Sequence, residues 1–412
     1  MAEESWTTGH FDATLLSGDL YVGHIPADVL CQCTHALIKL LVLDAEEADA
    51  AYYGSNCTNL TPPASLGTPS SHELEFHQGF GQVDESEFGM GASGVNIMLV
   101  QDVDGVTVVV NERYYRHMKL CGVVEHMRWS PVLWRALQIN LGPAGGDECS
   151  EIIGYLSTVL SEKDVSILNF STFASDLILV QDFDTLKAKN VLTEYGEQGV
   201  QGLKAQIRER QSPSEVSETA FFFDGEEKGS ASDSPRHARV ESEIDEVSSL
   251  VVCPAPLVLT TIKRVLLKQC MYSLMKQLSH HIDIHIRDRA MGGESGTGRT
   301  FVNNHASDYF WAYFSTHEEV SVLMDERDLK NFPEDSLCVC PQRWKAIRLV
   351  GKDIPFNQTG VVKRMSSPYE VGIQVLNMST YCTNVALVDE NEVNDAVKKL
   401  VTELKLGEVE TK

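Results

Sequence analysis

The chain has 412 residues, a length that predicts about two to four folded units. Its composition, 43% hydrophobic and 23% charged, is close to the globular average and excludes a wholly disordered protein. Acidic residues (59) outnumber Lys and Arg (34), and the resulting formal charge of -25 repels phosphate backbones and anionic lipid surfaces. We therefore expect neither a nucleic acid nor a membrane as a partner.

The compartment is predicted from the amino terminus and from the apolar stretches. Residues 1–10 are polar and acidic, without the basic start and apolar run of a signal peptide. The longest apolar stretches, residues 36–43 and 152–160, are shorter than the roughly 20 residues that cross a bilayer. These features predict a cytoplasmic protein.

The first region expected to fold is residues 8–130. A helical segment is predicted at residues 34–41, and residues 45–93 form an insertion rich in Gly, Ser, Pro, Asn and Glu. We interpret the insertion as a loop, because this composition favours turns and irregular backbone. The region is thus predicted to be one module with an interruption.

Residues 131–200 carry a clearer pattern. Residues 133–139 alternate in polarity as a strand requires, and residues 148–162 have apolar positions at helical spacing. Strands are predicted at residues 165–170 and 176–180, separated by a Ser-Thr-aromatic turn and followed by a further helix. This order is part of the ferredoxin-like βαββαβ unit.

The second half of the chain begins after an acidic, Ser-rich linker at residues 201–247, whose composition cannot bury enough apolar surface to fold. Residues 248–335 predict a third module, with a strand-like segment at residues 281–286 and a loop at residues 287–300. Residues 336–408 predict a fourth module, which an amphipathic helix closes.

An internal repeat supports this division. Three segments recur in the second half of the chain: those beginning at Trp134, Val165 and Val106 are echoed by those beginning at Trp344, Ile373 and Val320. The offsets are 210, 208 and 214 positions, and the order of the segments is the same in both halves. The repeat predicts an α+β protein of four ferredoxin-like modules arranged as two pairs.

One segment resembles a phosphate-binding loop. Residues 293–300 fit the spacing GxxxxG[KR]T, but Arg299 replaces the lysine whose compact ammonium group reaches between phosphates. A polar Asn-Asn-His segment follows in place of an apolar helix. A flexible insertion between a helix and a strand is therefore the favoured interpretation.

Metal binding and nucleophilic catalysis have little support in the sequence. His281, Asp283 and His285 would share one face of a strand, and imidazole and carboxylate groups are usual zinc ligands. No second cluster completes a ligand shell, so we interpret them as an exposed strand edge and expect no metal and no cofactor. No grouping of Ser, His and Asp is tied to a recognisable nucleophile turn. These points favour a protein that is not an enzyme.

Four segments resemble the CASTOR family, which are GATS-like ACT-domain proteins that act as cytosolic arginine sensors for the TOR kinase complex. The similar segments, in order and spacing, are residues 34–41, 165–180, 310–325 and 344–388. Proteins of that family contain four ACT modules, each with the order βαββαβ. The resemblance therefore implies an α+β fold of four tandem ACT modules arranged as two pairs.

The resemblance also implies an amino-acid site between the second and fourth modules. The matching positions are Ser166, Ile167, Gly360 and Val361 at the α-groups of the ligand, Thr380 and Tyr381 at its side-chain end, and Asn357, Gln358 and Asn384. The family pattern has acidic residues at the last three positions, and the carboxylate at the place of Asn384 pairs with the guanidinium of arginine. A guanidinium buried without that partner is penalised by several kcal/mol, whereas amides donate and accept. We therefore expect a free neutral amino acid rather than arginine.

A protein partner is implied in the same way. The family uses a surface near the Ser-Thr-aromatic turn to hold the GATOR complex, a regulator of TOR signalling, and the matching residues are Phe173, Ala174 and Asp176. Only Asp176 keeps the residue type of the family, and Phe173 could equally serve to pack the turn. Ferredoxin-like sheets also join side by side, which favours a homodimer.

The resulting hypothesis is a non-catalytic, amino-acid-binding regulator in TOR-type nutrient signalling. Two alternatives stay open at this point. One is an ACT-domain scaffold without a ligand, and the other is a nucleotide-binding protein that uses residues 293–300.

Overall fold

The computed structural model describes residues 4–7, 11–56, 94–140, 149–194, 247–291, 309–351, 359–381 and 383–406. Within these ranges, no helix is long and apolar enough to span a bilayer. The segment resembling a phosphate-binding loop, residues 293–300, lies outside them, as do residues 57–93 of the predicted insertion and residues 201–246 of the predicted linker.

The first module has the order strand, helix, strand, strand, helix, strand. Its elements are β3 (Leu20–Pro26), α1 (Leu30–Asn56), β4 (Val95–Asp102), β5 (Gly105–Asn111), α2 (Glu112–Leu120) and β6 (Arg128–Trp129). β4 pairs with β5, β5 with β3, and β3 with β6, all antiparallel, which is the strand order of a ferredoxin-like sheet. The side chain of Asn111 caps α2 by accepting a hydrogen bond from the Tyr114 amide at 3.2 Å.

The third module repeats this arrangement. Its elements are β11 (Leu257–Ile262), α5 (Leu267–Met291), β12 (Trp311–Thr316), β13 (Val320–Asp325) and β14 (Leu337–Val339). β12 pairs with β13, and β11 lies between β13 and β14. Asp325 stands 214 positions after Asn111 and caps the following 3-10 turn in the same way, accepting from the Arg327 amide at 2.8 Å.

The second and fourth modules confirm the strands and helices predicted from the repeat. The second contains β7 (Trp134–Asn140), α3 (Cys149–Glu162), β8 (Ile167–Ser171), β9 (Asp176–Gln181) and a helix over residues 185–194. The fourth contains β15 (Trp344–Gly351), α6 (Val361–Met365), β16 (Val375–Ser379), β17 (Asn384–Asp389) and α7 (Val393–Glu403). Short 3-10 turns are η3 (Val124–His126), η4 (Asp182–Asp184), η5 (Arg264–Leu266), η7 (Glu326–Asn331) and η8 (Ser367–Val371).

The outer strand of each of these two sheets comes from an earlier part of the chain. β1 (Glu4–Thr7) pairs with β2 (Asp12–Leu15), and β2 pairs with β7, with Asp12 opposite Asn140. In the fourth module β10 (Val247–Val252) pairs with β15. The range 8–130 expected for the first module therefore contains a strand of the second module's sheet.

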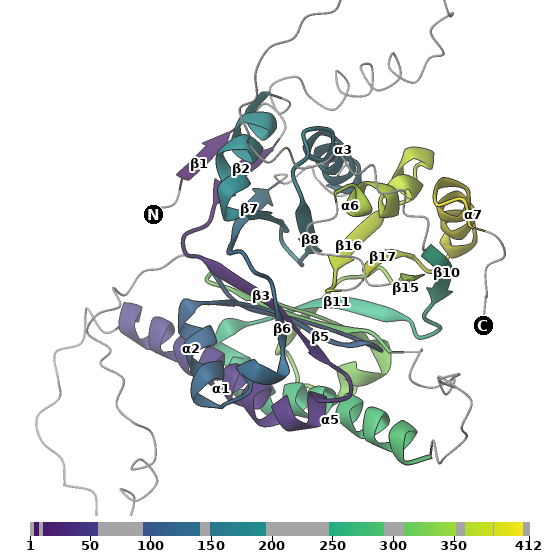
Figure 1. The fold of residues 1–412 in the computed structure, drawn as a ribbon. Coiled ribbons are helices and arrows are strands. Elements are labelled where there is room, and N and C mark those ends of the chain that lie inside the picture. Colours follow the sequence, from purple (N-terminus) through teal and green to yellow (C-terminus); the bar gives the residue numbers. More distant parts are fainter. Residues whose placement is uncertain are drawn as a thin grey trace, which may run out of the picture.

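Edge strands join the modules into two pairs. β12 pairs with β4 along most of its length, which makes one continuous sheet of the first and third modules. β16 meets β8 where Met378 stands opposite Phe170, which joins the second and fourth modules. Figure 1 shows α1, α2 and α5 on one side of the molecule and α3, α6 and α7 on the opposite side. This arrangement confirms the predicted α+β fold.

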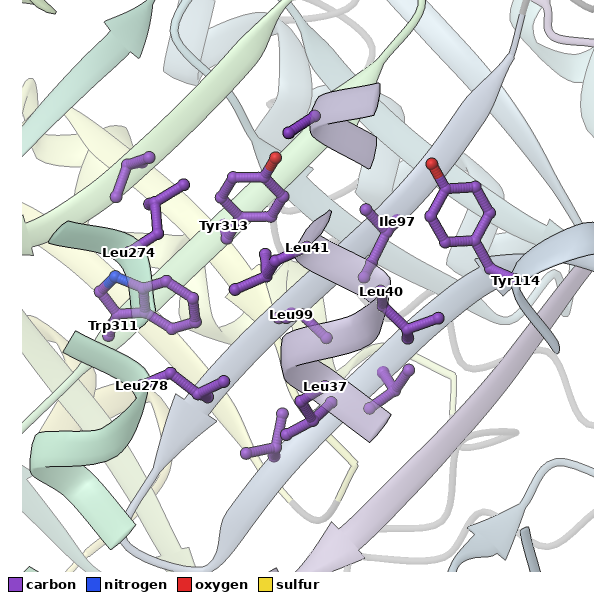
Figure 2. Packing of buried hydrophobic residues seen from close by; sticks show 14 of the residues in the cluster. Leu37, Leu40, Leu41, Ile97, Leu99, Tyr114, Leu274, Leu278, Trp311 and Tyr313 are labelled. Carbon is purple, nitrogen blue, oxygen red and sulfur yellow. The ribbon is translucent and has the colours of Figure 1, made fainter. Parts of the chain in front are cut away.

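The core follows from the alternation of side chains along the strands. On β4, Ile97 and Leu99 pack against α1 and α5, in a cluster that also contains Trp311 (Figure 2). Met98 and Val100 point to the opposite face, into a second cluster shared by both sheets. In that cluster Phe170 of β8 meets Phe314 of β12, with ring centroids 6.0 Å apart. The two sheets therefore pack face to face, with helices on both outer sides.

Two sequence predictions were wrong. The insertion predicted as loop from residue 45 begins as helix, because α1 continues to Asn56 through a run of Ala and Glu, which are strong helix formers. The strand-like segment at residues 281–286 lies within α5. Its apolar residues alternate over a short run, a pattern that cannot by itself separate strand from buried helix.

Candidate functional site

A polar seam runs between the second and fourth modules, where β8 and β16 lie side by side (Figure 1). On β8, Leu168 and Phe170 face the cluster between the sheets, whereas Ile167 packs against α3. Asn169 and Ser171 therefore face the helix layer, as Ile167 does. The same alternation on β16 turns Asn377 and Ser379 toward the helices. These four residues are polar and buried.

Two hydrogen bonds cross the seam with approximate two-fold symmetry. The Asn169 amide N–H donates to Ser379 Oγ at 2.9 Å, and the Asn377 amide N–H donates to Ser171 Oγ at 3.2 Å. Each donor and each acceptor is related to its counterpart by 208 positions, the offset of the sequence repeat. The duplicated sequence therefore builds a duplicated contact, and the symmetry axis passes between Phe170 and Met378.

Asn384, predicted to bind the ligand, lies at one end of this seam. It begins β17 directly opposite Ser379, and its Nδ2 donates to Ser379 Oγ at 3.0 Å. The residue is 1% exposed, and its Oδ1 has no hydrogen-bond partner among the described residues. One acceptor of the predicted contact residue is thus still available.

Three more of the predicted residues are buried in the second and fourth modules. Ser166 and Ile167 are buried at the start of β8, and Val361 is buried at the start of α6. The next residue, Val362, belongs to the same apolar cluster as Ile167. Asn357 and Gln358, which precede this helix, lie outside the described residues.

Gly360 holds the turn into α6 in a left-handed conformation, with φ of +80°. A Cβ at this position would lie 3.2 Å from the Ser161 Oγ of α3, so glycine also permits the close approach of α6 to α3. We predict that Gly360→Ala lowers the free energy of unfolding by about 1 to 2 kcal/mol, since L-residues are strained at positive φ. Gly372, with φ of +85° and open space around it, is the matched control.

Urea denaturation of both variants separates strain from crowding at this turn. Gly372→Ala should carry the backbone strain alone, and Gly360→Ala should be the more destabilised of the two. Equal losses would contradict a role for the Ser161 contact.

Thr380 and Tyr381 form the turn after β16. The Thr380 Oγ1 donates to the Thr383 carbonyl at 3.1 Å, which closes the turn. The Tyr381 amide donates to Thr107 Oγ1 at 2.8 Å, and its ring stacks on His24 with centroids 4.9 Å apart. The structure thus places the Tyr381 ring against the first module.

The predicted partner-binding turn occupies the equivalent place in the second module. The Phe173 amide donates to Ser321 Oγ at 3.0 Å, and the Ala174 amide donates to Glu319 Oε2 at 3.2 Å. Ala174 is exposed and Phe173 half-buried, whereas Asp176 is only 7% exposed. The turn is therefore held on the β12–β13 hairpin of the third module, with Ala174 open to solvent.

Asp176 differs in charge from its counterpart Asn384, 208 positions later. Burial raises the pKa of Asp176 to about 6, the Glu319 carboxylate adds to the increase, and a hydrogen bond from Ser171 opposes it. Its Oδ1 has no hydrogen-bond partner among the described residues. The two ends of the seam are thus alike in backbone but carry an acid at one end and an amide at the other.

Sequence reasoning missed the two asparagines in the middle of the seam. Asn169 and Asn377 occur at equivalent positions of the repeat, and each is flanked by apolar residues in the middle of a strand. A polar residue repeated at such a position is a usable signal, because burying an amide is costly without a partner.

The chain is similar to a known domain family and to several known proteins. Residues 130–194 and 339–402 match the ACT domain family. The "Cytosolic arginine sensor for mTORC1 subunit 1" of Rattus norvegicus is 25% identical over 246 residues, which is 57% of this chain and 63% of that protein. The protein of the same name from Bos taurus is 22% identical over 310 residues, covering 73% and 84%.

Among solved structures, an aspartate kinase from Synechocystis gives a TM-score of 0.26 at 8% identity, covering 76% of this chain and 50% of that one. That overlap is too low to argue from. The two ACT matches coincide with the second and fourth modules, which form the seam, and the arginine-sensor relatives extend over more of the chain. The chain thus contains two ACT domains, and it is distantly homologous, at 22 to 25% identity, to proteins named as cytosolic arginine sensors for mTORC1.

Proposed function

We propose that this protein is a non-catalytic regulator that binds a free amino acid between its second and fourth modules. The observation that carries the proposal is the seam between β8 and β16, where the side-chain amide of Asn169 and the Oδ1 of Asn384 have no hydrogen-bond partner among the described residues. Buried polar groups in proteins are almost always paired, and unpaired ones call for a bound molecule or water. The arginine-sensing function in the names of the relatives gives the class of ligand.

The ligand should be a neutral amino acid. Asn384 stands where a carboxylate would have to neutralise a guanidinium, and its Nδ2 is already committed to Ser379. An unpaired guanidinium in this buried place would lose several kcal/mol of hydration without compensation. A neutral side chain incurs no such penalty, and arginine is therefore disfavoured.

Binding at the seam can change the surface that a partner meets. Ser171 ends β8 and leads directly into the turn that carries Phe173 and Ala174, which the third module holds through Ser321 and Glu319. A ligand that fits one arrangement of the two modules better than another shifts the population toward it. We propose that a GATOR-like complex in the cytoplasm binds this turn.

Self-association belongs to the same proposal. The edges of β4, β8, β12 and β16 are already paired within the chain, so a second copy in a homodimer would contact another surface.

A thermal-shift panel of the purified chain against each amino acid tests the ligand. A neutral amino acid at 100 times its dissociation constant should stabilise the protein by about 2.7 kcal/mol. The shift should be lost in Ser166→Ala, because Ser166 is the predicted contact for the α-groups. A shift with arginine alone would contradict the neutral ligand, and silence toward every amino acid would favour a scaffold without ligand.

The same panel includes ATP as a probe of residues 293–300. A shift with ATP, abolished by Arg299→Ala, would favour the nucleotide-binding alternative instead.

A further inference from the structure

The side chain of Asn169 is buried in the seam without a hydrogen-bond partner among the described residues. It is 0% exposed, and neither its Nδ2 nor its Oδ1 has a hydrogen-bond partner among the described residues. Its backbone is well placed, because the amide N–H donates to Ser379 Oγ and the residue pairs with Ile178 within its own sheet. The backbone of Asn169 is therefore hydrogen-bonded, whereas its side chain is not bonded within the described part of the chain.

Ser379 brings Asn169 and Asn384 to the same end of the seam. Its Oγ accepts both the Asn169 backbone N–H at 2.9 Å and the Asn384 Nδ2 at 3.0 Å. Both asparagines face the helix layer. β8 begins at Ile167, directly after Ser166, so Asn169 is two to three positions from the residues predicted to contact the α-groups of the ligand.

The unpaired atoms define the chemistry of a complementary group. Asn169 offers an N–H donor and a carbonyl acceptor, and Asn384 adds a second carbonyl acceptor. A carboxamide supplies N–H donors for both acceptors and a carbonyl for the donor. A guanidinium has no acceptor, and an aliphatic side chain would leave all three atoms unpaired. Exchanging the O and N of Asn169 leaves the same set.

We infer that Asn169 and Asn384 together recognise the side-chain carboxamide of an amide amino acid. This inference rests on the proposed function, since it names the side chain of the ligand at that same site. Asn169 would determine specificity, whereas the contacts to the α-groups would be common to any amino acid.

Asn377, the counterpart of Asn169, provides a matched control. It occupies the equivalent position on β16, and its Nδ2 already donates to Ser366 Oγ at 2.8 Å, so only its Oδ1 has no hydrogen-bond partner among the described residues. Removing the Asn377 amide should therefore break a bond within the protein. Removing the Asn169 amide should remove the desolvation penalty of an unpaired buried group. In the absence of ligand, Asn169→Leu should therefore melt at a higher temperature than the wild type.

Isothermal titration of the full chain with L-glutamine and with L-methionine, which has similar length and no amide, tests the inference. The wild type should bind glutamine at least tenfold more tightly, since methionine would leave the buried amide atoms unpaired. Asn169→Leu should lose this preference and keep its affinity for methionine, whereas Asn377→Leu should keep the preference.

Equal binding of glutamine and methionine by the wild type would overturn the inference and leave the proposed amino-acid site standing. An unchanged preference in Asn169→Leu would also overturn it, and would point to buried water as the partner of this side chain. Binding of neither amino acid, with a response to no other, would remove the proposed function as well.

Discussion

Asp176→Asn is expected to raise the free energy of unfolding at pH 7 by up to about 3 kcal/mol, because burial raises the pKa of this carboxyl from 3.8 to about 6. A carboxyl whose pKa is higher in the folded protein binds its proton more tightly there. Its favourable contribution is present below about pH 4 and is lost as the pH rises through 6. Asparagine cannot ionise, so the variant should avoid this loss.

Chemical denaturation of both proteins between pH 4 and pH 8 measures the effect. The wild type should lose stability relative to the variant across this interval, and the difference should level off above pH 7. Asp182→Asn changes the net charge equally at an exposed position and should leave the curve unmoved. If the free energies of unfolding of wild type and Asp176→Asn changed in parallel with pH, the pKa of Asp176 would not be raised, and a partner would have to stabilise its charged form.

Other buried acids also affect how the stability of the wild type changes with pH, but they contribute equally to the variant. Burial also raises the pKa of Glu319 and brings the pKa of Asp102 to about 6, with a further contribution from Asp104 at Asp102. Both groups are present in wild type and variant. The subtraction therefore isolates Asp176 together with its coupling to Glu319.

Asp44→Ala should destabilise the protein by about 3 to 5 kcal/mol, since it leaves the buried hydroxyls of Tyr313 and Ser315 without the acceptor they share. Asp44 lies on α1 and is fully buried. Its Oδ2 accepts from the Tyr313 hydroxyl at 2.5 Å. Its Oδ1 accepts from Ser315 Oγ at 2.9 Å, from Tyr114 Oη at 3.1 Å and from Asn96 Nδ2 at 3.1 Å.

This carboxylate connects two modules. Tyr313 and Ser315 belong to β12 of the third module, whereas Asp44, Asn96 and Tyr114 belong to the first. Burial and the Asp44 carboxylate raise the pKa of the Tyr313 phenol well above its ordinary value. The phenol therefore stays protonated and donates.

Urea denaturation of Asp44→Ala, with Tyr313→Phe as the control, checks the assignment. Tyr313→Phe removes the hydroxyl donor together with its hydrogen bond to Asp44, and should lower the free energy of unfolding by about 1 kcal/mol. A loss in Asp44→Ala no larger than in Tyr313→Phe would mean that the donors find other acceptors.

The elements of the second and fourth modules could be predicted because their signals are local. Strand β7 and helix α3 each show their own periodicity, and the repeat placed Trp134 and Trp344 at equivalent positions. The assignment of β2 to the second module's sheet could not be predicted this way. Its pairing of Asp12 with Asn140 joins residues far apart in the chain, and four residues carry too little pattern to choose a partner.

The candidate site shows the same limit. Ser166 and Asn384 are predicted through a resemblance that depends on their positions in the sequence. Asn169 and Asp44 were missed because their significance depends on which groups surround them in space. Asn169 looks like an ordinary strand residue until its side chain is seen to lack partners, and Asp44 like the last residue before a loop until α1 is seen to continue.

β2 and β10, the outer strands that precede the rest of their sheets in the chain, also determine when the protein can fold. β2 is synthesised long before β7, and although it can pair with β1 at once, its other edge lacks its partner until β7 has been made. The same delay separates β10 from β15. Such distant pairings give a high contact order, which slows folding. A fragment limited to residues 131–200 would lack β2 and would present β7 as an open edge, prone to join the edge of another molecule.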